Sequence, residues 1–570
     1  MQAVLLGAAT ALAGLVASLL PAGAALEESL GLKVLFALRG ARPAPAEVLL
    51  VGIDKRSAEA LGLPRDPARW PRSLHARLTE TLARAGARVI AFDLFFEQER
   101  GPDDDRRFAR AIERAGNVVL ARFLTWDTAP LAAPGGPGGH LSVEHLVPPV
   151  RLLAEAAAGT APFPLPKVPV RVNRYWTFKP GAGDAPTLPA VAFQLFALDA
   201  YDDLVAHLLR LAPEQARALP RDRRAFVAAG PAEVTVGRIR ELFDGAPHLA
   251  ARLLAQLEAP GAGDDPVRAA RLRALVRLYA GPDSPYLDYY GPPGSIRTLP
   301  YHEVLALEGE PAGSPRLAPL AGAAVFVGMS EYLRPTQKDG FYTVYSDDEG
   351  RDISGVEIAA TAFANLLEAR PLEPLPPLAH AAVVLAGGAA LGVGCRLLPP
   401  LWAAAWALAA ALAYLAGAQQ AFARAGSWWP LVVPLLLQTP LALAAGVAWR
   451  YAEVSRERWR IRRLLAYHVP EAVIEELPAD FPRGATDGRL AYGVCLATDA
   501  ERYTGLAESL EPAELAGLMN RYYAALFEPI RRHGGIVSDV VGDAALAIWA
   551  GAAPDPTLRA RACRAACEVA

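Results

Sequence analysis

The chain has 570 residues, of which 53% are hydrophobic and 21% are charged, and its mean hydropathy is +0.19. This apolar excess excludes a disordered or fibrous chain and indicates a membrane protein with soluble parts. The 57 Lys and Arg residues nearly balance the 60 Asp and Glu residues, so we expect no nucleic-acid partner. The cysteines are Cys395, Cys495, Cys563 and Cys567, and no disulfide can form before Cys395.

Four apolar segments are long enough to cross the roughly 30 Å hydrocarbon layer of a bilayer. The first covers residues 3–26, and the others follow close together at 378–398, 401–423 and 428–449. A cleaved signal peptide is the alternative for the first segment, although no basic residue precedes its apolar run. Buried helices of a soluble protein are the alternative for the others, but such helices would have to be apolar on every face.

Arginines crowd the chain after the last apolar segment, from Arg450 to Arg463, and the positive-inside rule places this end in the cytoplasm. Four crossings then put the N-terminus inside as well. The expected plan is a membrane helix at 1–26, an outer region at 27–377, three membrane helices at 378–449, a coupling linker at 450–488 and a C-terminal domain at 489–570. This plan is the layout of a multi-pass receptor.

The outer region alternates predicted strands and helices. The apolar runs 47–53, 88–96 and 117–121 predict strands, and the segments between them have helical spacing. After residue 125 the pattern blurs, and it recovers as a strand at 323–329 and a helix at 355–367. This alternation predicts an α/β fold with a largely parallel sheet.

Acidic residues of the outer region allow two interpretations. Asp54 and Asp93 end strands, where α/β folds often place binding groups, but we favour caps of turns. The acidic run at 103–105 suits a hard cation, yet a solvated helix N-terminus explains it with fewer assumptions. We therefore assign no metal there.

Several motifs of the outer region resemble one family. VGIDKRSAEALG at 51–62, WPRSLHARL at 70–78, GARVIAFDLFFEQ at 86–98 and ISGVEIAATAFANLL at 353–367 are similar to the second CHASE family of bacterial extracellular sensors. The order of one span, this sensor, three spans and a cytoplasmic output domain also agrees. The resemblance implies a bacterial inner-membrane location and an extracellular ligand that it does not identify.

The segment after the last span has two interpretations. Val454, Ile461, Leu464 and His468 follow an approximate heptad, which predicts a short parallel helix pair that couples two protomers. An amphipathic stretch with arginines on lipid phosphates is the alternative. LLAYHVPEAVIEEL at 464–477 resembles the linker that precedes many bacterial cyclase domains, a helix interrupted by Pro470.

Two aspartates near the C-terminus lie at the ends of predicted strands. Asp499 follows the apolar run 489–497, and Asp543 belongs to a Gly-Asp pair between the runs 535–541 and 544–549. Such a pair predicts a tight hairpin with Asp543 exposed at its tip. If the hairpin pairs beside the first strand, both carboxylates converge on a site that suits Mg²⁺. A structural hairpin with an N-capping Asp499 is the alternative.

The C-terminal segment resembles a second family. LATDAERYTGLAE at 496–508 and LMNRYYAALFEPIRRHGGIVSDVVGDAALAIWAG at 518–551 are similar to class III nucleotide cyclases, which make cyclic AMP or cyclic GMP from a nucleoside triphosphate. The resemblance implies part of an α/β domain of the ferredoxin-like, palm-type fold that acts as a homodimer. It assigns Asp499 and Asp543 to two Mg²⁺ or Mn²⁺ ions. Against the triphosphate it places the backbone of Ala500, Glu501, Arg502 and Tyr503.

Two departures from the cyclase family bear on activity. The position of its adenine-selective lysine holds Asp539, which accepts hydrogen bonds from a base, so the choice between ATP and GTP stays open. The sequence reaches Ala570 before the asparagine and arginine that stabilise the family's transition state. We therefore expect no catalytic residue here beyond the two metal ligands.

Together these patterns predict a sensor-regulated adenylate or guanylate cyclase, a phosphorus–oxygen lyase in the membrane, whose sequence here is C-terminally incomplete. The expected partners are a nucleoside triphosphate, an extracellular ligand, the lipid bilayer and a second copy of the chain. The alternative is a non-enzymatic receptor whose degenerate cyclase remnant serves for dimerisation or docking. A transporter fits less well, because no charged residue lies in the middle of a span.

Overall fold

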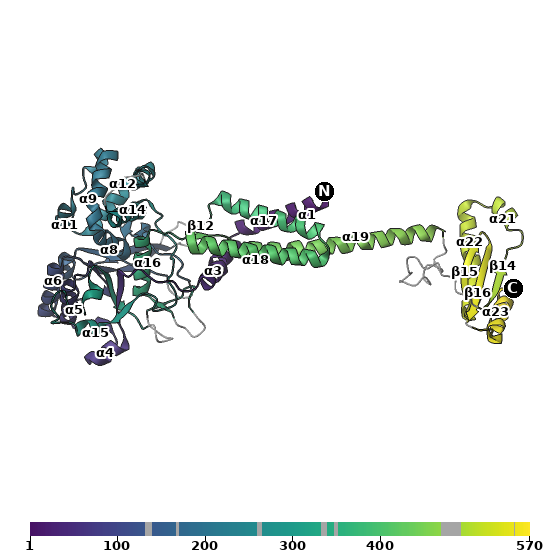
Figure 1. Cartoon of the computed structure of the whole chain (residues 1–570), viewed down its shortest axis with the longest axis horizontal. Helices are drawn as coiled ribbons and strands as arrows, with labels where there is room; N and C mark the ends of the chain where they lie inside the picture. Colours follow the sequence, from purple (N-terminus) through teal and green to yellow (C-terminus); the bar gives the residue numbers. More distant parts are fainter. Residues whose placement is uncertain are drawn as a thin grey trace. The chain divides into compact units, whose positions relative to one another are not determined.

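The computed structural model describes residues 1–130, 140–166, 170–258, 265–331, 339–346, 352–468, 492–551 and 553–570. These residues form two compact units, Met1–Gly446 and Val447–Ala570. The first unit holds a sheet flanked by helices together with the apolar helices, and the second holds a small antiparallel sheet (Figure 1).

The sheet of the first unit is largely parallel, as predicted. Its parallel strands lie in the order β5, β3, β2, β9, β1, β8, which are Gly159–Pro162, Val118–Pro130, Val89–Phe95, Ala324–Met329, Val48–Ile53 and Thr298–Pro300. The C-terminal part of β3, from Phe123 to Pro130, pairs in antiparallel fashion with β4, His140–Val147. The predicted strands are confirmed as β1, β2, β3 and β9. Strands β4, β5 and β8 were not predicted: β4 lies where the sequence pattern blurs, and β5 and β8 are too short to show a pattern.

Helices cover both faces of this sheet because successive strand residues point to opposite sides. Val48 and Leu50 of β1 pack on one face and Leu49 and Val51 on the other, and all four are fully buried. The first face carries α8 (Leu188–Phe196), α12 (Ala232–Asp244), α14 (Pro266–Ala280) and α16 (Gly355–Glu368). The second carries α5 (Arg72–Arg84), α6 (Pro102–Ala115) and α15 (Tyr301–Leu305).

The remaining elements of the first unit are short or peripheral. Its helices are α3 (Leu32–Arg39), α4 (Lys55–Leu61), α7 (Arg151–Ala156), α9 (Tyr201–Leu211), α10 (Pro213–Ala216), α11 (Arg223–Ala228) and α13 (His248–Glu258). Its small strands are β6 (Phe178–Lys179), β7 (Ala185–Pro186), β10 (Gly340–Phe341), β11 (Ile353–Ser354), β12 (Glu373–Pro374) and β13 (Ser427–Trp428).

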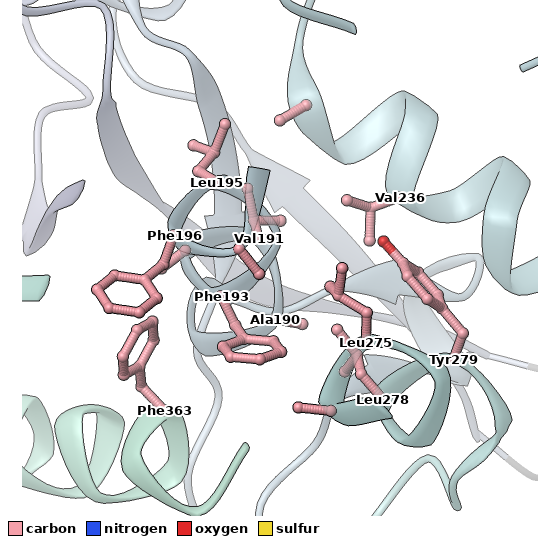
Figure 2. Packing of buried hydrophobic residues seen from close by; sticks show 14 of the residues in the cluster. Ala190, Val191, Phe193, Leu195, Phe196, Val236, Leu275, Leu278, Tyr279 and Phe363 are labelled. Atoms are coloured by element: carbon pink, nitrogen blue, oxygen red, sulfur yellow. The ribbon is translucent and has the colours of Figure 1, made fainter. Parts of the chain in front are cut away.

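Aromatic and aliphatic side chains from several helices fill the space over the first face of the sheet. Phe193 and Phe196 of α8 meet Phe363 of α16 edge to face, with ring centroids 5.8 and 5.4 Å apart (Figure 2). Val236 of α12 and Tyr279 of α14 close the same cluster. These helices occupy the part of the chain where the sequence pattern blurs, and burial of their apolar faces on the sheet holds them in place.

Among the residues described, three helices are long and apolar enough to cross a membrane: α1 (Gln2–Leu19), α17 (Pro377–Leu397) and α18 (Pro400–Ala425). Helix α1 ends before the predicted residue 26. Pro21 begins a separate helix, α2 (Pro21–Leu26), and Leu20 before it is extended, as residues that precede proline usually are.

The fourth predicted crossing, 428–449, is not one regular apolar helix. It contains the π-helical segment η6 (Val433–Gln438), which includes Pro434 and leads into α19 (Thr439–His468). The predicted heptad at 454–468 falls on α19, but its side chains from 461 on lie outside the described residues, as does all of 469–491 with Pro470.

The apolar helices pack through small and polar side chains. A Cβ atom added at Gly392 of α17 would lie 2.7 Å from the Cα atom of Gly7 in α1, so this approach requires glycine. Gln438 of η6 is fully buried, and its Nε2 atom donates to the carbonyl oxygens of Thr10 at 3.3 Å and Val384 at 2.9 Å. The start of the fourth segment therefore belongs to the same bundle as α1 and α17.

The acidic residues of the outer region have structural roles. Asp54 caps α4, since its Oδ1 atom accepts the Ser57 N–H at 2.7 Å, as predicted. The prediction of a solvated run at 103–105 is wrong for Asp105, which is 3% exposed. Its Oδ1 atom lies 3.1 Å from Nε of Arg72, and its Oδ2 atom accepts the Arg100 N–H at 3.0 Å.

The second unit has three antiparallel strands in the order β14, β16, β15, which are Tyr492–Thr498, Ala544–Gly551 and Ile536–Val541. Helices α22 (Pro512–Arg532) and α23 (Pro556–Val569) bury Phe527 and Trp549 against one face, and α21 (Tyr503–Ser509) follows β14. Val541 pairs with Ala544, which confirms the two-residue hairpin turn at 542–543.

Glu357 of α16 makes the stability of the first unit depend on pH. Its side chain is 2% exposed, and its Oε1 atom accepts the N–H groups of Gly294 at 2.9 Å and Ile296 at 3.3 Å. Burial raises the pKa of Glu357 from 4.5 to about 7. Because the folded state holds this proton more tightly than the unfolded state, the stability that Glu357 contributes is complete below about pH 4.5 and is lost as the pH rises through about 7.

We expect the Tm of the chain to fall between pH 5 and pH 8 by more than that of the Glu357→Gln variant, which lacks this titration. The difference corresponds to about 3 kcal/mol of unfolding free energy. Thermal unfolding in lipid nanodiscs measures it, and Glu113→Gln, at an exposed position of α6, is the matched control. Parallel Tm profiles for wild type and Glu357→Gln would contradict the assignment.

Candidate functional site

The two candidate metal ligands lie at the same end of the sheet in the second unit. Thr498 of β14 pairs with Ala545 of β16 in antiparallel register, so Asp499 and Asp543 follow outward from this pair. The Oδ2 atom of Asp543 accepts the backbone N–H of Ala500 at 3.2 Å. The hairpin therefore pairs beside the first strand, and the strand ends bring both aspartates together.

Helix α22 holds the hairpin turn in place. The hydroxyl of Tyr522 donates to the carbonyl oxygen of Asp543 at 3.2 Å, and the hydroxyl of Tyr523 donates to that of Gly542. Gly542 has φ +66°, a left-handed conformation that favours glycine. Asp543 is consequently half-buried, and the prediction that it is exposed at the tip is wrong. The sequence did not predict this role of Tyr522 and Tyr523, because it depends on contacts with a turn about 20 residues away in the chain.

The donors at this end of the sheet fit a metal that is shared with a substrate. Among the described side chains, no group of three or more His, Cys, Asp and Glu residues could hold a metal ion. Asp499 and Asp543 supply two carboxylates, and Mg²⁺ commonly takes one or two carboxylates with waters and substrate phosphates. These two carboxylates could therefore hold a metal ion only if waters or the oxygens of a bound ligand complete its coordination.

The predicted phosphate-binding backbone forms a turn rather than the start of a helix. Helix α21 begins at Tyr503, after Arg502 with φ +62°. The Ala500 N–H donates to Oδ2 of Asp543, and the Tyr503 N–H donates to the Ala500 carbonyl oxygen at 3.4 Å. Glu501 and Arg502 lie exposed in the turn between them. To bind phosphate, the N–H groups of Ala500 and Tyr503 would have to give up these hydrogen bonds within the protein.

Asp539, the candidate base-reading residue, lies on β15 beside a register shift. It pairs with Leu546, and the shift falls between Val537 and Asp539. Its Oδ1 atom accepts the Val540 N–H at 2.9 Å, and the residue is exposed. The second carboxylate oxygen remains available to accept a further hydrogen bond.

The first unit contains a second candidate site, a cavity of about 1030 Å³. Asp93, Phe163 and Met329, at the carboxyl ends of β2, β5 and β9, line it together with Arg122, where the parallel part of β3 ends. These strands are neighbours in the sheet, and α/β folds commonly bind ligands at the carboxyl ends of their strands. Only Asp93 was considered from the sequence, because the other lining residues come together through the fold.

One short segment joins this cavity to the apolar helices. In η1 (Glu27–Gly31), Glu28 lines the cavity and accepts a hydrogen bond from Nδ2 of Asn173 at 3.4 Å. Its neighbour Glu27 is buried, and its two carboxylate oxygens accept the N–H groups of Leu431 at 2.8 Å and Val433 at 2.9 Å. Adjacent residues thus contact the cavity wall and the start of the helical segment that continues into α19.

Comparison with known proteins identifies the first unit. The family model of the CHASE2 domain matches residues 9–394, more than half of the chain. The chain belongs to the CHASE2 domain family. CHASE2 is a sensor domain typical of signalling receptors, so the α/β sheet belongs to a sensor domain.

The curated relatives of this chain match it over only about 100 residues. The uncharacterized proteins Rv1319c and Rv1318c of Mycobacterium tuberculosis are 33% and 32% identical to it over 94 residues. Uncharacterized protein Mb1354c of Mycobacterium bovis is 30% identical over 100 residues. These matches cover 16 to 18% of this chain and 17% of each relative, so the chain spans about one sixth of their length. No solved structure matches.

We expect Asp543→Ala to expose the Ala500 amide, because the substitution removes its acceptor. A hydrogen bond of this kind contributes about 1 kcal/mol, so amide exchange at Ala500 should quicken about fivefold. Hydrogen–deuterium exchange of the full chain measures this. Asp539→Ala in the same hairpin is the control and should leave Ala500 protected. Equal protection in wild type and Asp543→Ala would contradict the contact.

Proposed function

We propose that the chain is a membrane receptor in which the CHASE2 sensor, outside the cell, regulates a cytoplasmic class III nucleotide cyclase domain. The reaction converts ATP or GTP into the 3′,5′-cyclic nucleotide and pyrophosphate in a homodimer. The observation that carries this proposal is the position of Asp499 and Asp543 at one end of the β14–β16 pair, with Asp543 bonded to the Ala500 N–H. The resemblance of residues 496–551 to cyclases supports it.

In this proposal Asp499 and Asp543 hold two Mg²⁺ or Mn²⁺ ions together with the substrate triphosphate. When bound, such ions lower the pKa of an attacking hydroxyl and neutralise charge on the phosphates. Asp543 has a second role, because its bond to Ala500 anchors the turn that leads to Tyr503. Asp539 is proposed to accept a hydrogen bond from the base, which leaves ATP and GTP as alternative substrates.

We propose four membrane crossings with both chain ends in the cytoplasm of a bacterial cell. Three helices have the necessary length and composition. The burial of Gln438 against Thr10 and Val384 supports the fourth crossing, since it places the start of that segment inside the bundle. Packing of Gly7 against Gly392 supports an uncleaved α1, because a removed signal peptide would leave the α17 face uncovered.

We propose that η1 carries the signal from the sensor to α19. Glu28 contacts the sensor through Asn173, while Glu27 caps the helical segment that begins beside Leu431. A carboxylate at a helix N-terminus satisfies orphan N–H groups and complements the helix dipole. A shift of η1 would therefore disturb the hydrogen bonds of Leu431 and Val433, at the start of the helical segment that continues into α19.

The cyclase proposal predicts metal-dependent activity of the protein expressed from the complete open reading frame that contains these residues. With Mn²⁺ and ATP or GTP, membranes should form cyclic nucleotide. Asp499→Ala and Asp543→Ala should each lower the rate by roughly 100-fold or more, because bound metal supplies several kcal/mol of transition-state stabilisation. Glu508→Ala, at an exposed position of α21, is the control.

The outcomes separate the two candidate functions. Activity that survives both aspartate substitutions would discard the two-metal site. A complete absence of cyclic nucleotide from the wild-type protein would favour the non-enzymatic receptor, in which the cyclase-like unit serves for dimerisation or docking.

The coupling proposal predicts two effects of Glu27→Ala. Loss of two charge-assisted hydrogen bonds should raise amide exchange at Leu431 and Val433 by roughly tenfold or more, and basal cyclic nucleotide output should change severalfold. Glu373→Ala, at an exposed position of β12, is the matched control and should change neither. Faster exchange with unchanged output would confirm the cap and contradict the signalling route.

A further inference from the structure

Aromatic side chains form one wall of the sensor cavity. Phe95, Phe123 and Trp126 line it, and they are 48, 37 and 60% exposed. The rings of Phe95 and Phe123 meet edge to face with centroids 4.8 Å apart. Exposed rings in a hollow offer a surface on which a flat ligand can stack, and aromatic contacts add to the burial of apolar area.

Two arginines of the cavity have only neutral partners. Arg171 donates to the carbonyl oxygen of Ser29 and, at 2.9 Å, to the hydroxyl of Tyr342. Arg174 lies 3.7 Å above the ring of Tyr286 and donates to its hydroxyl. Neither arginine forms an ion pair with any described residue, so both charges are available to an anionic ligand.

A third guanidinium of the cavity is buried and incompletely bonded. Arg72 is 4% exposed and lies 4.7 Å from the ring centroid of Phe96. Its Nε atom faces Asp105, whereas its buried Nη1 atom has no hydrogen-bond partner in the described part of the chain. A buried donor without an acceptor is unfavourable, and an anionic oxygen beside Phe96 would satisfy it.

Most carboxylates of the cavity are already engaged. Glu144 pairs with Nζ of Lys179 at 2.9 Å, and Asp66 accepts the N–H of Ala68 at 3.1 Å. Glu28 accepts a hydrogen bond from Asn173, and Asp93 and Asp339 also have partners. Exposed Glu97 is the exception. Because the guanidinium groups of Arg171 and Arg174 lack acidic partners among the described residues and most carboxylates have partners, the cavity favours an anionic ligand over a cationic one.

We propose that this cavity is the ligand site of the CHASE2 sensor and that it binds a small aromatic anion, a planar ring that carries a carboxylate or a comparable group. Its volume of about 1030 Å³ is large enough to admit a ligand of that class with room to spare, so the lining and not the volume carries the choice of ligand. Bound ligand would meet the wall that includes Glu28, next to Glu27 in η1. The inference rests on the sensor role of the domain and is independent of cyclase activity.

Two probes with the same ring and opposite charge test the proposal. Indole-3-acetate and tryptamine are titrated calorimetrically into the full chain in lipid nanodiscs, without nucleotide, and empty nanodiscs correct for partition into lipid. Indole-3-acetate should bind at least about tenfold more tightly than tryptamine, because charge-assisted hydrogen bonds form only with the anion. Since no nucleotide is present, a failure of the cyclase proposal leaves this result unaffected.

Substitutions locate the binding. Arg174→Gln should weaken indole-3-acetate binding about tenfold and leave tryptamine binding nearly unchanged, whereas Trp126→Ala should weaken both about fivefold. Arg224→Gln and Trp459→Ala, at exposed positions outside the cavity, are the matched controls. Thermal unfolding checks that each variant is folded.

Three results would overturn the proposal. Tryptamine binding as tight as that of indole-3-acetate would show that the cavity does not select for negative charge. Binding that neither Arg174→Gln nor Trp126→Ala weakens would place the probes elsewhere on the protein. Absence of binding by both probes up to millimolar concentration would reject an aromatic anion as the ligand class.

Discussion

The carboxylate of Glu27 accepts N–H groups at the start of the helical segment that continues into α19, and this contact ties the parts of the first unit together. Glu27 follows the first apolar helix in the chain, and its neighbour Glu28 lines the sensor cavity. A buried carboxylate must keep its hydrogen-bond donors, because losing them leaves an uncompensated charge. The segment that follows the first apolar helix is therefore held at this residue to the start of the helical segment that continues into α19.

The sensor sheet explains why the cavity exists where it does. Strand β9 is inserted between β1 and β2, so the carboxyl ends of β5, β3, β2 and β9 are adjacent although β9 comes late in the chain. Residues at these strand ends line the cavity, and parallel α/β sheets commonly bind ligands at this edge. Ion pairs such as Arg72 with Asp105 brace its rim, since α5 and α6 each contribute one member.

The second unit shows how a small antiparallel sheet positions acidic groups. The register of β14 and β16 places Asp499 and Asp543 at one end, and the tyrosine hydroxyls of α22 hold the turn between β15 and β16. In the proposed cyclase, the phosphate oxygens of the substrate would complete the coordination of metal ions that these two carboxylates hold. In both units, strand ends present the candidate site residues and side chains of neighbouring helices contact them.

Local patterns in the sequence determined much of this protein. The apolar runs that became β1, β2 and β9, the Gly-Asp hairpin turn, the cap at Asp54 and the three long apolar helices all depend on residues close together in the chain. Only the tertiary structure decided the burial of Asp105, the cap by Glu27, the half-buried Asp543 and the aromatic and basic lining of the cavity. Each of these requires partners from distant segments, whose meeting depends on strand order and helix packing rather than on local periodicity.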